Sequence, residues 1–171
     1  MTRKRNTSAF SLIELIVVMM LIGILTTVVI IKYTGVDSQG NRIAANQLRT
    51  HLTYIRNMAI NHERAMKVQF DVVSNNYEVF MAVSNWTGSY LPARDPVTRK
   101  DWIVDLDSKF SGVALYTVAI TINGNNTLYF SETNGMPFDV NRASLTTNGV
   151  ITFSSGVKVI VAPVTGYADT D

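Results

Sequence analysis

The sequence predicts an α+β fold in which a long N-terminal helix, first hydrophobic and then amphipathic, packs on an antiparallel β-sheet domain. An almost wholly apolar run occupies positions 10–31. Apolar residues then recur at spacings of three and four over about 41–61, which is typical of an amphipathic helix. The rest of the chain alternates β-branched or aromatic segments with turn signals, which is typical of antiparallel strands.

The first nine residues, MTRKRNTSA, carry the net positive charge of the chain. All 171 residues include 15 basic and 13 acidic side chains, a net charge of +2. Without Arg3, Lys4 and Arg5 there are 12 basic side chains against 13 acidic ones, a net charge of −1. The net positive charge therefore comes from a leader at 1–9, and it is no general argument that the chain binds nucleic acid. The absence of cysteine excludes disulfides and thiolate metal sites.

Residues 10–32 are predicted to form a transmembrane helix. At about 1.5 Å per residue the apolar run reaches roughly 33 Å, enough to cross a hydrocarbon core. The run ends in IIKYTGVDSQG, which offers no A-x-A cleavage site, so we expect it to remain as an anchor. Because the basic residues precede it, the N-terminus is expected in the cytoplasm and residues 33–171 outside it. A buried core helix is the less favoured alternative.

Glu14 is the one charged residue within this apolar run. A carboxylate inside a spanning helix costs about 2.5–3.5 kcal/mol and is usually paired or functional. Cleavage after Ala9 would expose an α-amino group on Phe10, about one helical turn before Glu14. One interpretation pairs Glu14 with this amine, in the same chain or in a neighbour. The other lets the carboxylate reach the headgroups.

The segment AFSLIEL, residues 9–15, resembles the class III (prepilin) signal of type IV pilins and pseudopilins. In that family a membrane aspartic peptidase, the prepilin peptidase, cuts before a Phe, N-methylates it, and leaves Glu at the fifth mature position. The resemblance implies processing between Ala9 and Phe10, and a role for Glu14 in subunit assembly. Ala9 stands where Gly is usual, and the helix-breaking Pro common near the end of the run is absent.

Residues 33–171 are predicted to form a periplasmic globular domain. The segment YTGVDSQGN at 33–41 carries two glycines, and we expect it to loosen or break the helix, with Asp37 or Ser38 capping a restart. The amphipathic helix at about 41–61 is expected to cover the sheet. Its apolar positions are Ala44, Leu48, Leu52, Ile55 and Ala59.

The remaining chain is predicted to form strands joined by turns. The expected strands are Met66–Val72, Tyr77–Val83, Trp102–Leu106, Gly112–Ile122, Thr127–Ser131, Val150–Ser154 and Val157–Ala162. Hairpin turns are expected at Asn123–Asn126 and Ser154–Gly156. A charged, proline-containing loop is expected at 90–101, with Trp86 and Trp102 packing beneath it.

Three further segments resemble the GspH/FimT pseudopilin group. They are LTYIRNMAI at 52–60, FSETNGMP at 130–137 and ITFSSGVKVIVAPVTGYA at 151–168. Members are minor subunits of type II secretion pseudopili or type IV pili. The resemblance implies three kinds of partner: prepilin peptidase, other pilins or pseudopilins in a filament, and an inner-membrane assembly platform. It also implies a single-pass protein of the bacterial inner membrane that later enters a filament.

No arrangement of residues predicts an enzyme, a metal site or a cofactor. Nothing nearby completes a ligand set with His51 and His62, so an ordinary surface role is expected for both. Asp101, Asp105 and Asp107 lack the Gly-bearing loop of a calcium site and are expected to form a solvated acidic edge. The serines lack a G-x-S-x-G elbow, and no glycine-rich loop suits phosphate.

Two groups of basic residues are candidates for contacts with a ligand or partner. The candidates are Arg42, Arg49 and Arg56, spaced by seven on the predicted helix, and Arg94, Arg99 and Lys100 in the loop. A solvated face is the favoured interpretation of the helix group, ahead of a filament contact or an anion site. The alternative functions are a DNA-binding minor pilin, which the net charge of −1 disfavours, and a bitopic periplasmic protein that never joins a filament.

Overall fold

The computed structural model describes residues 12–84, 88–110, 112–119 and 126–171, and it confirms the predicted α+β class. The leader at 1–9, Ala9, Phe10 and Trp86 lie outside the described residues. The described helices are α1 (Leu12–Asn61) and α2 (Leu106–Lys109). The described strands are β1 (Met66–Asp71), β2 (Asn76–Ala82), β3 (Tyr90–Pro92), β4 (Ile103–Asp105), β5 (Leu115–Ala119), β6 (Thr127–Phe130), β7 (Pro137–Phe138), β8 (Gly149–Phe153), β9 (Lys158–Val161) and β10 (Ala168–Thr170).

The chain divides between Val36 and Asp37 into two compact units. In the first unit, the side chains from Leu12 to Ile24 are all exposed. A search of the described residues finds no helix with both the length and the apolar character needed to cross a membrane. The second unit contains all ten described strands and its own hydrophobic core.

Helix α1 runs without a break through residues 33–41, so the expected interruption there is wrong. No helix restarts at Asp37 or Ser38, because both residues lie inside α1. A glycine within a helix costs about 1 kcal/mol relative to alanine, which weakens a helix without ending it. Proline, which would block the backbone hydrogen bonding, does not occur in the segment.

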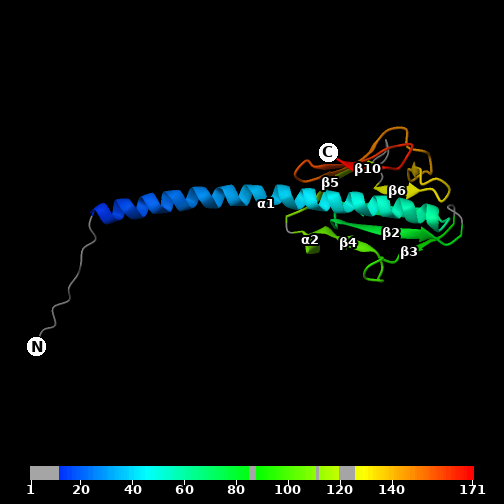
Figure 1. Ribbon diagram of the computed structural model, residues 1–171, viewed down its shortest axis with the longest axis horizontal. Helices are drawn as coiled ribbons and strands as arrows, with labels where there is room; N and C mark the ends of the chain where they lie inside the picture. Colours follow the sequence, from blue (N-terminus) through cyan, green and yellow to red (C-terminus); the bar gives the residue numbers. More distant parts are fainter. Residues whose placement is uncertain (1–11, 85–87, 111, 120–125) are drawn as a thin grey trace, which may run out of the picture. The chain divides into compact units, whose positions relative to one another are not determined.

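Two antiparallel sheets, rather than one, form the β part of the second unit. The first has the strand order β3-β2-β1-β6-β7, with β4 also paired to β2, and the second has the order β10-β9-β8-β5. Helix α1 touches both sheets, through His51 with Tyr77 of β2 and through Arg49 with Ala168 of β10. Figure 1 shows β2 and β4 on one side of the helix and β5 and β10 on the other.

The core lies between α1 and the inner faces of the sheets. The predicted apolar stripe of α1 is confirmed, because its members are at most 1% exposed. These buried members are Ala44, Leu48, Leu52, Ile55 and Ala59. Alternate residues of β1 and β8, such as Val68 and Ile151, are fully buried against them. Burying each large aliphatic side chain contributes about 1.5–3 kcal/mol, so this packing holds the second unit together.

The strand predictions are confirmed in place for β1, β2, β4, β5, β6, β8 and β9, whereas β3, β7, β10 and the short α2 were not expected. The hairpin at Ser154–Gly156 is confirmed, with Gly156 at φ +85°. The expected hairpin at Asn123–Asn126 stays a prediction, because residues 120–125 lie outside the described part. Strand β5 pairs with β8 in one sheet, while β6 pairs with β1 and β7 in the other.

Candidate functional site

Glu14 lies in the first turn of α1 as the structure describes it. Around it the large apolar side chains are exposed, with Ile13 70% and Leu15 54% accessible. A helix that is apolar all round is stable only when lipid or other helices cover it. Glu14 is therefore a charged group in a segment that needs an apolar covering. Its pairing with the Phe10 amine stays a prediction, since Phe10 lies outside the described residues.

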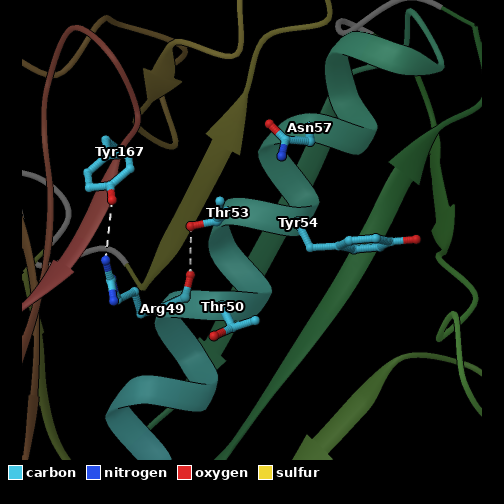
Figure 2. A pocket seen from close by; sticks show the side chains of 6 residues that line it. All are labelled: Arg49, Thr50, Thr53, Tyr54, Asn57 and Tyr167. Carbon is cyan, nitrogen blue, oxygen red and sulfur yellow. Dashed lines mark hydrogen bonds between the residues drawn. The ribbon is translucent and has the colours of Figure 1, made fainter.

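Arg49 and Arg56, two of the candidate basic residues, hold the C-terminal segment against α1. Nε of Arg49 donates to the carbonyl oxygen of Ala168 at 3.2 Å, and its Nη2 donates to the Tyr167 hydroxyl at 3.2 Å (Figure 2). Its Nε also lies 3.5 Å from Oδ1 of Asp169. Nε of Arg56 donates to the carbonyl oxygen of Thr165 at 2.7 Å. Both guanidinium groups are thus engaged within the chain, contrary to a simply solvated face.

Arg56 also explains two glycines in the segments that resemble the GspH/FimT group. Gly135 has φ +67° and Gly166 has φ +65°, a region that L side chains rarely adopt. A Cβ at Gly135 would lie 2.8 Å from Cγ of Arg56, and a Cβ at Gly166 would lie 2.5 Å from the carbonyl oxygen of Gly135. The three segments with the family resemblance therefore meet at one point, which the sequence alone did not reveal.

The other candidate basic residues are exposed to solvent: Arg42, Arg94, Arg99 and Lys100. Arg42 lines a cavity of about 270 Å³ together with Thr170 and Asp171. Nη1 of Arg94 pairs with Oδ1 of Asp101 at 3.2 Å, across the base of the 95–100 turn. The expected loop at 90–101 is corrected at its start, where Tyr90–Pro92 forms β3 beside β2. Hydrogen bonding to the edge of the first sheet outweighs the turn signal of Pro92, which tolerates an edge strand.

His51 is partly buried, so the expected surface role is wrong for this residue, whereas His62 is exposed. Nδ1 of His51 is hydrogen-bonded to the Tyr77 hydroxyl at 2.7 Å. Burial, helped by the positive charge of Lys109, lowers the pKa of His51 to about 4. The ring is therefore neutral at neutral pH. Sequence reasoning missed this because the partner, Tyr77, comes from a strand that the sequence does not place beside the helix.

Trp102 packs beneath the loop as expected, with 2% of its surface exposed. Its ring meets those of His51 and Tyr54 edge-on, with centroids 5.2 and 5.8 Å apart. Its Nε1 has no hydrogen-bond partner among the described residues. This buried donor is the one polar side-chain atom of the described part that stands out as unsatisfied.

The acidic residues near the loop have structural roles rather than forming only a solvated edge. Oδ1 of Asp105 accepts from the backbone N–H groups of Asp107 and Ser108, at 2.9 and 3.2 Å, and so caps α2. Oδ1 of Asp107 accepts from Nδ2 of Asn75 at 2.6 Å. Within the described ranges, no group of three or more His, Cys, Asp or Glu residues is placed to hold a metal ion.

Two neighbouring cavities lie along the outward face of α1, and they share Thr50 and Tyr54. The larger, about 370 Å³, is lined by Arg49, Thr50, Thr53, Tyr54, Asn57 and Tyr167 (Figure 2). The smaller, about 220 Å³, is lined by Thr50, His51, Tyr54, Asp95, Pro96, Val97 and Trp102. Sequence reasoning missed this surface. The one available signal was Tyr54, a large aromatic residue outside the apolar stripe of the helix.

Comparison with known proteins gives two family matches that follow one another along the chain. The prokaryotic N-terminal methylation motif matches residues 4–30, and the family described as type II transport protein GspH matches residues 44–166. No curated protein sequence matches the chain.

Two solved structures share the fold. The minor pseudopilin EpsH from the type 2 secretion system of Vibrio cholerae superposes with a TM-score of 0.55 at 12% identity, covering 77% of this chain and 95% of that one. The type IV minor pilin FimU of Pseudomonas aeruginosa superposes with a TM-score of 0.51 at 14% identity, covering 80% and 91%. At these identities the likeness concerns the fold alone.

Proposed function

The chain belongs to the GspH family of type II transport proteins, and we propose from this premise that it is a processed, membrane-anchored subunit of a filament. It is a minor pseudopilin or pilin, of a type II secretion pseudopilus or a type IV pilus. In the proposal, prepilin peptidase cuts between Ala9 and Phe10 and methylates Phe10. The anchor at 10–32 holds the protein in the inner membrane, with residues 33–171 in the periplasm, until an assembly platform moves it into the filament.

One observation supports the assembly step most directly: Glu14 is the only charged side chain on a helical segment that is otherwise apolar and exposed. Every described side chain from Leu12 to Ile24 is accessible. In a filament, the apolar side chains would be covered by neighbouring helices, which leaves the carboxylate in an apolar environment. An amine at the same depth offsets the cost of burying that charge, and Phe10 after cleavage supplies one four residues away.

Substitution of Glu14 by Gln tests this pairing. The variant keeps the size of the side chain and removes its charge, so membrane insertion should persist. The amine of Phe10 would then lack its partner, and recovery with purified filament subunits should fall by about tenfold or more. Glu63→Gln serves as the matched control, because Glu63 is an exposed carboxylate just beyond the C-terminal end of α1. Equal recovery of the Glu14→Gln variant and the control would refute the pairing.

The alternative of a DNA-binding minor pilin gains no support from the side-chain arrangement. Arg49 and Arg56 bind carbonyl groups of the C-terminal segment, and Arg94 is paired with Asp101. The three guanidinium groups therefore already have partners within the chain, which makes them poorer ligands for the phosphates of DNA. The bitopic alternative is distinguished by the same co-isolation experiment, because a protein that never joins a filament would not be recovered with its subunits.

A further inference from the structure

The smaller cavity on α1 has aromatic walls and an accessible edge. Tyr54 is 43% exposed, while Trp102 behind it is 2% exposed. Val97, on the loop that forms the opposite rim, is 86% exposed. An incoming group would therefore meet the ring of Tyr54 and the side chain of Val97 first, with the ring of Trp102 behind them. The electron-rich face of an aromatic ring attracts cations.

Asp95 supplies a negative charge to the same cavity. Its partial burial acts to raise the pKa, but backbone N–H groups of Thr98 and Val97 outweigh this and hold the pKa of Asp95 below its ordinary value. Both backbone bonds, at 2.9 and 2.7 Å, go to Oδ1, and no described hydrogen bond engages Oδ2. His51 beside it is neutral at neutral pH, and the positive charge of Lys109, an exposed residue of α2, also helps to lower the pKa of Asp95.

We propose that this pocket receives a lysine or arginine side chain from a neighbouring filament subunit. Tyr54 binds the cation through its ring, and Asp95 pairs with it as a carboxylate. Trp102, which is 2% exposed, forms the buried aromatic wall behind this contact. The inference rests on the proposed function, since the partner is taken to be a subunit of the same filament.

The larger cavity extends this surface for the rest of the partner segment. Besides Thr50 and Tyr54, it is lined by Asn57 and Tyr167. Figure 2 shows the hydroxyl of Tyr167, from the C-terminal segment, directed toward Arg49, while the ring of Tyr54 extends from α1 on the side away from Tyr167. Its one charged lining residue, Arg49, is bonded to Tyr167, Ala168 and Asp169. A segment with an uncharged stretch beside its basic residue therefore fits across both cavities.

The chain offers a closely matched control for this pocket in the turn after β1. Oδ1 of Asp71 accepts from the N–H groups of Val73 and Ser74 at 2.8 and 3.0 Å, as Oδ1 of Asp95 does from Val97 and Thr98. Val73 is 97% exposed, like Val97 on its own turn. The two turns thus present the same local geometry, but only one of them borders the aromatic pocket.

Photo-cross-linking in cells that assemble the filament tests the proposal with the full chain. Benzoyl-phenylalanine replaces Val97 in one variant and Val73 in the other. Asp95→Asn and Asp71→Asn are each combined with the Val97 probe. Both keep Oδ1 as an acceptor and remove the charge.

The expected result is a cross-link from position 97 to a filament subunit, at a peptide that contains a lysine or arginine. Asp95→Asn should lower its yield roughly fivefold, as for the loss of an ion pair, while Asp71→Asn leaves it unchanged. An unchanged yield in Asp95→Asn, or equal cross-linking from position 73, would overturn the proposal.

If the chain co-isolates with filament subunits without this cross-link, the pocket proposal fails and the proposed function stands. If it does not co-isolate at all, both fail.

Discussion

At the scale of single residues, the close approach of Gly135, Gly166 and Arg56 explains why two segments far apart in the chain both need glycine. Each glycine combines a positive φ with a contact that leaves no room for a Cβ. Gly156 separates the two effects, because it has φ +85° and nothing within 4 Å of a Cβ. The sequence places Gly135 and Gly166 in segments that resemble the GspH/FimT group but does not indicate that they share a neighbour.

We predict that Gly166→Ala destabilises the second unit by about 3 kcal/mol, whereas Gly156→Ala costs about 1 kcal/mol. The smaller value is the backbone cost of a positive φ, and the larger adds steric overlap with a backbone carbonyl that has little freedom to move. Urea unfolding of the full chain in detergent, followed by near-ultraviolet circular dichroism, measures the difference. Equal midpoints for the two variants would contradict the close packing at Gly166.

His51 predicts a pH dependence of stability with a definite sign. Its pKa is lowered from 6.5 to about 4 in the folded state, so between these values the unfolded chain binds the extra proton. The contribution is present in full above pH 6.5 and is lost as the pH falls to about 4. His51→Gln should therefore weaken the drop in the urea midpoint between pH 7 and pH 4.5. His62→Gln, at an exposed position, should leave that drop as it is, and the reverse ranking would refute the assignment.

At the scale of secondary-structure elements, periodicity predicted the buried face of α1 and the positions of seven strands. These predictions succeeded because the alternation of apolar residues directly reflects which side faces the core. The short strands β3, β7 and β10 were missed. Short edge strands have too few residues for a pattern, and their pairing is decided by distant partners. For the same reason, the two cavities that share Tyr54, one lined by Asp95 and the other by Tyr167, could not be predicted from the sequence.

The continuity of α1 through residues 33–41 is testable by amide hydrogen exchange. Backbone hydrogen bonds in this segment should slow exchange relative to the turn at Val73, which is exposed. Gly35→Ala should slow exchange further, by roughly fivefold, because alanine favours the helix by about 1 kcal/mol. Exchange of residues 44–59 should not change. Rates at 33–41 that match those of an unstructured peptide would show that the glycines interrupt the helix.

At the scale of the whole molecule, the N-terminal helix and the β domain divide the work of a filament subunit. The first unit presents apolar surface that is stable only under lipid or against other helices. The second unit encloses its own core and engages Arg49 and Arg56 in hydrogen bonds with its C-terminal segment, so the candidate recognition surface is that of the two cavities beside α1. The composition and the charge of the leader were enough to predict the apolar character of the first unit. The surface of the second unit could be described only from the fold.

The central claim is that a carboxylate in an apolar helix is paired with an amine that exists only after cleavage before Phe10. Intact-mass and N-terminal analysis of the protein, purified from membranes of cells with active prepilin peptidase, tests it most directly. The account predicts a chain that lacks residues 1–9 and begins with N-methylated Phe10. A chain that keeps Met1 and the basic leader under these conditions would contradict it.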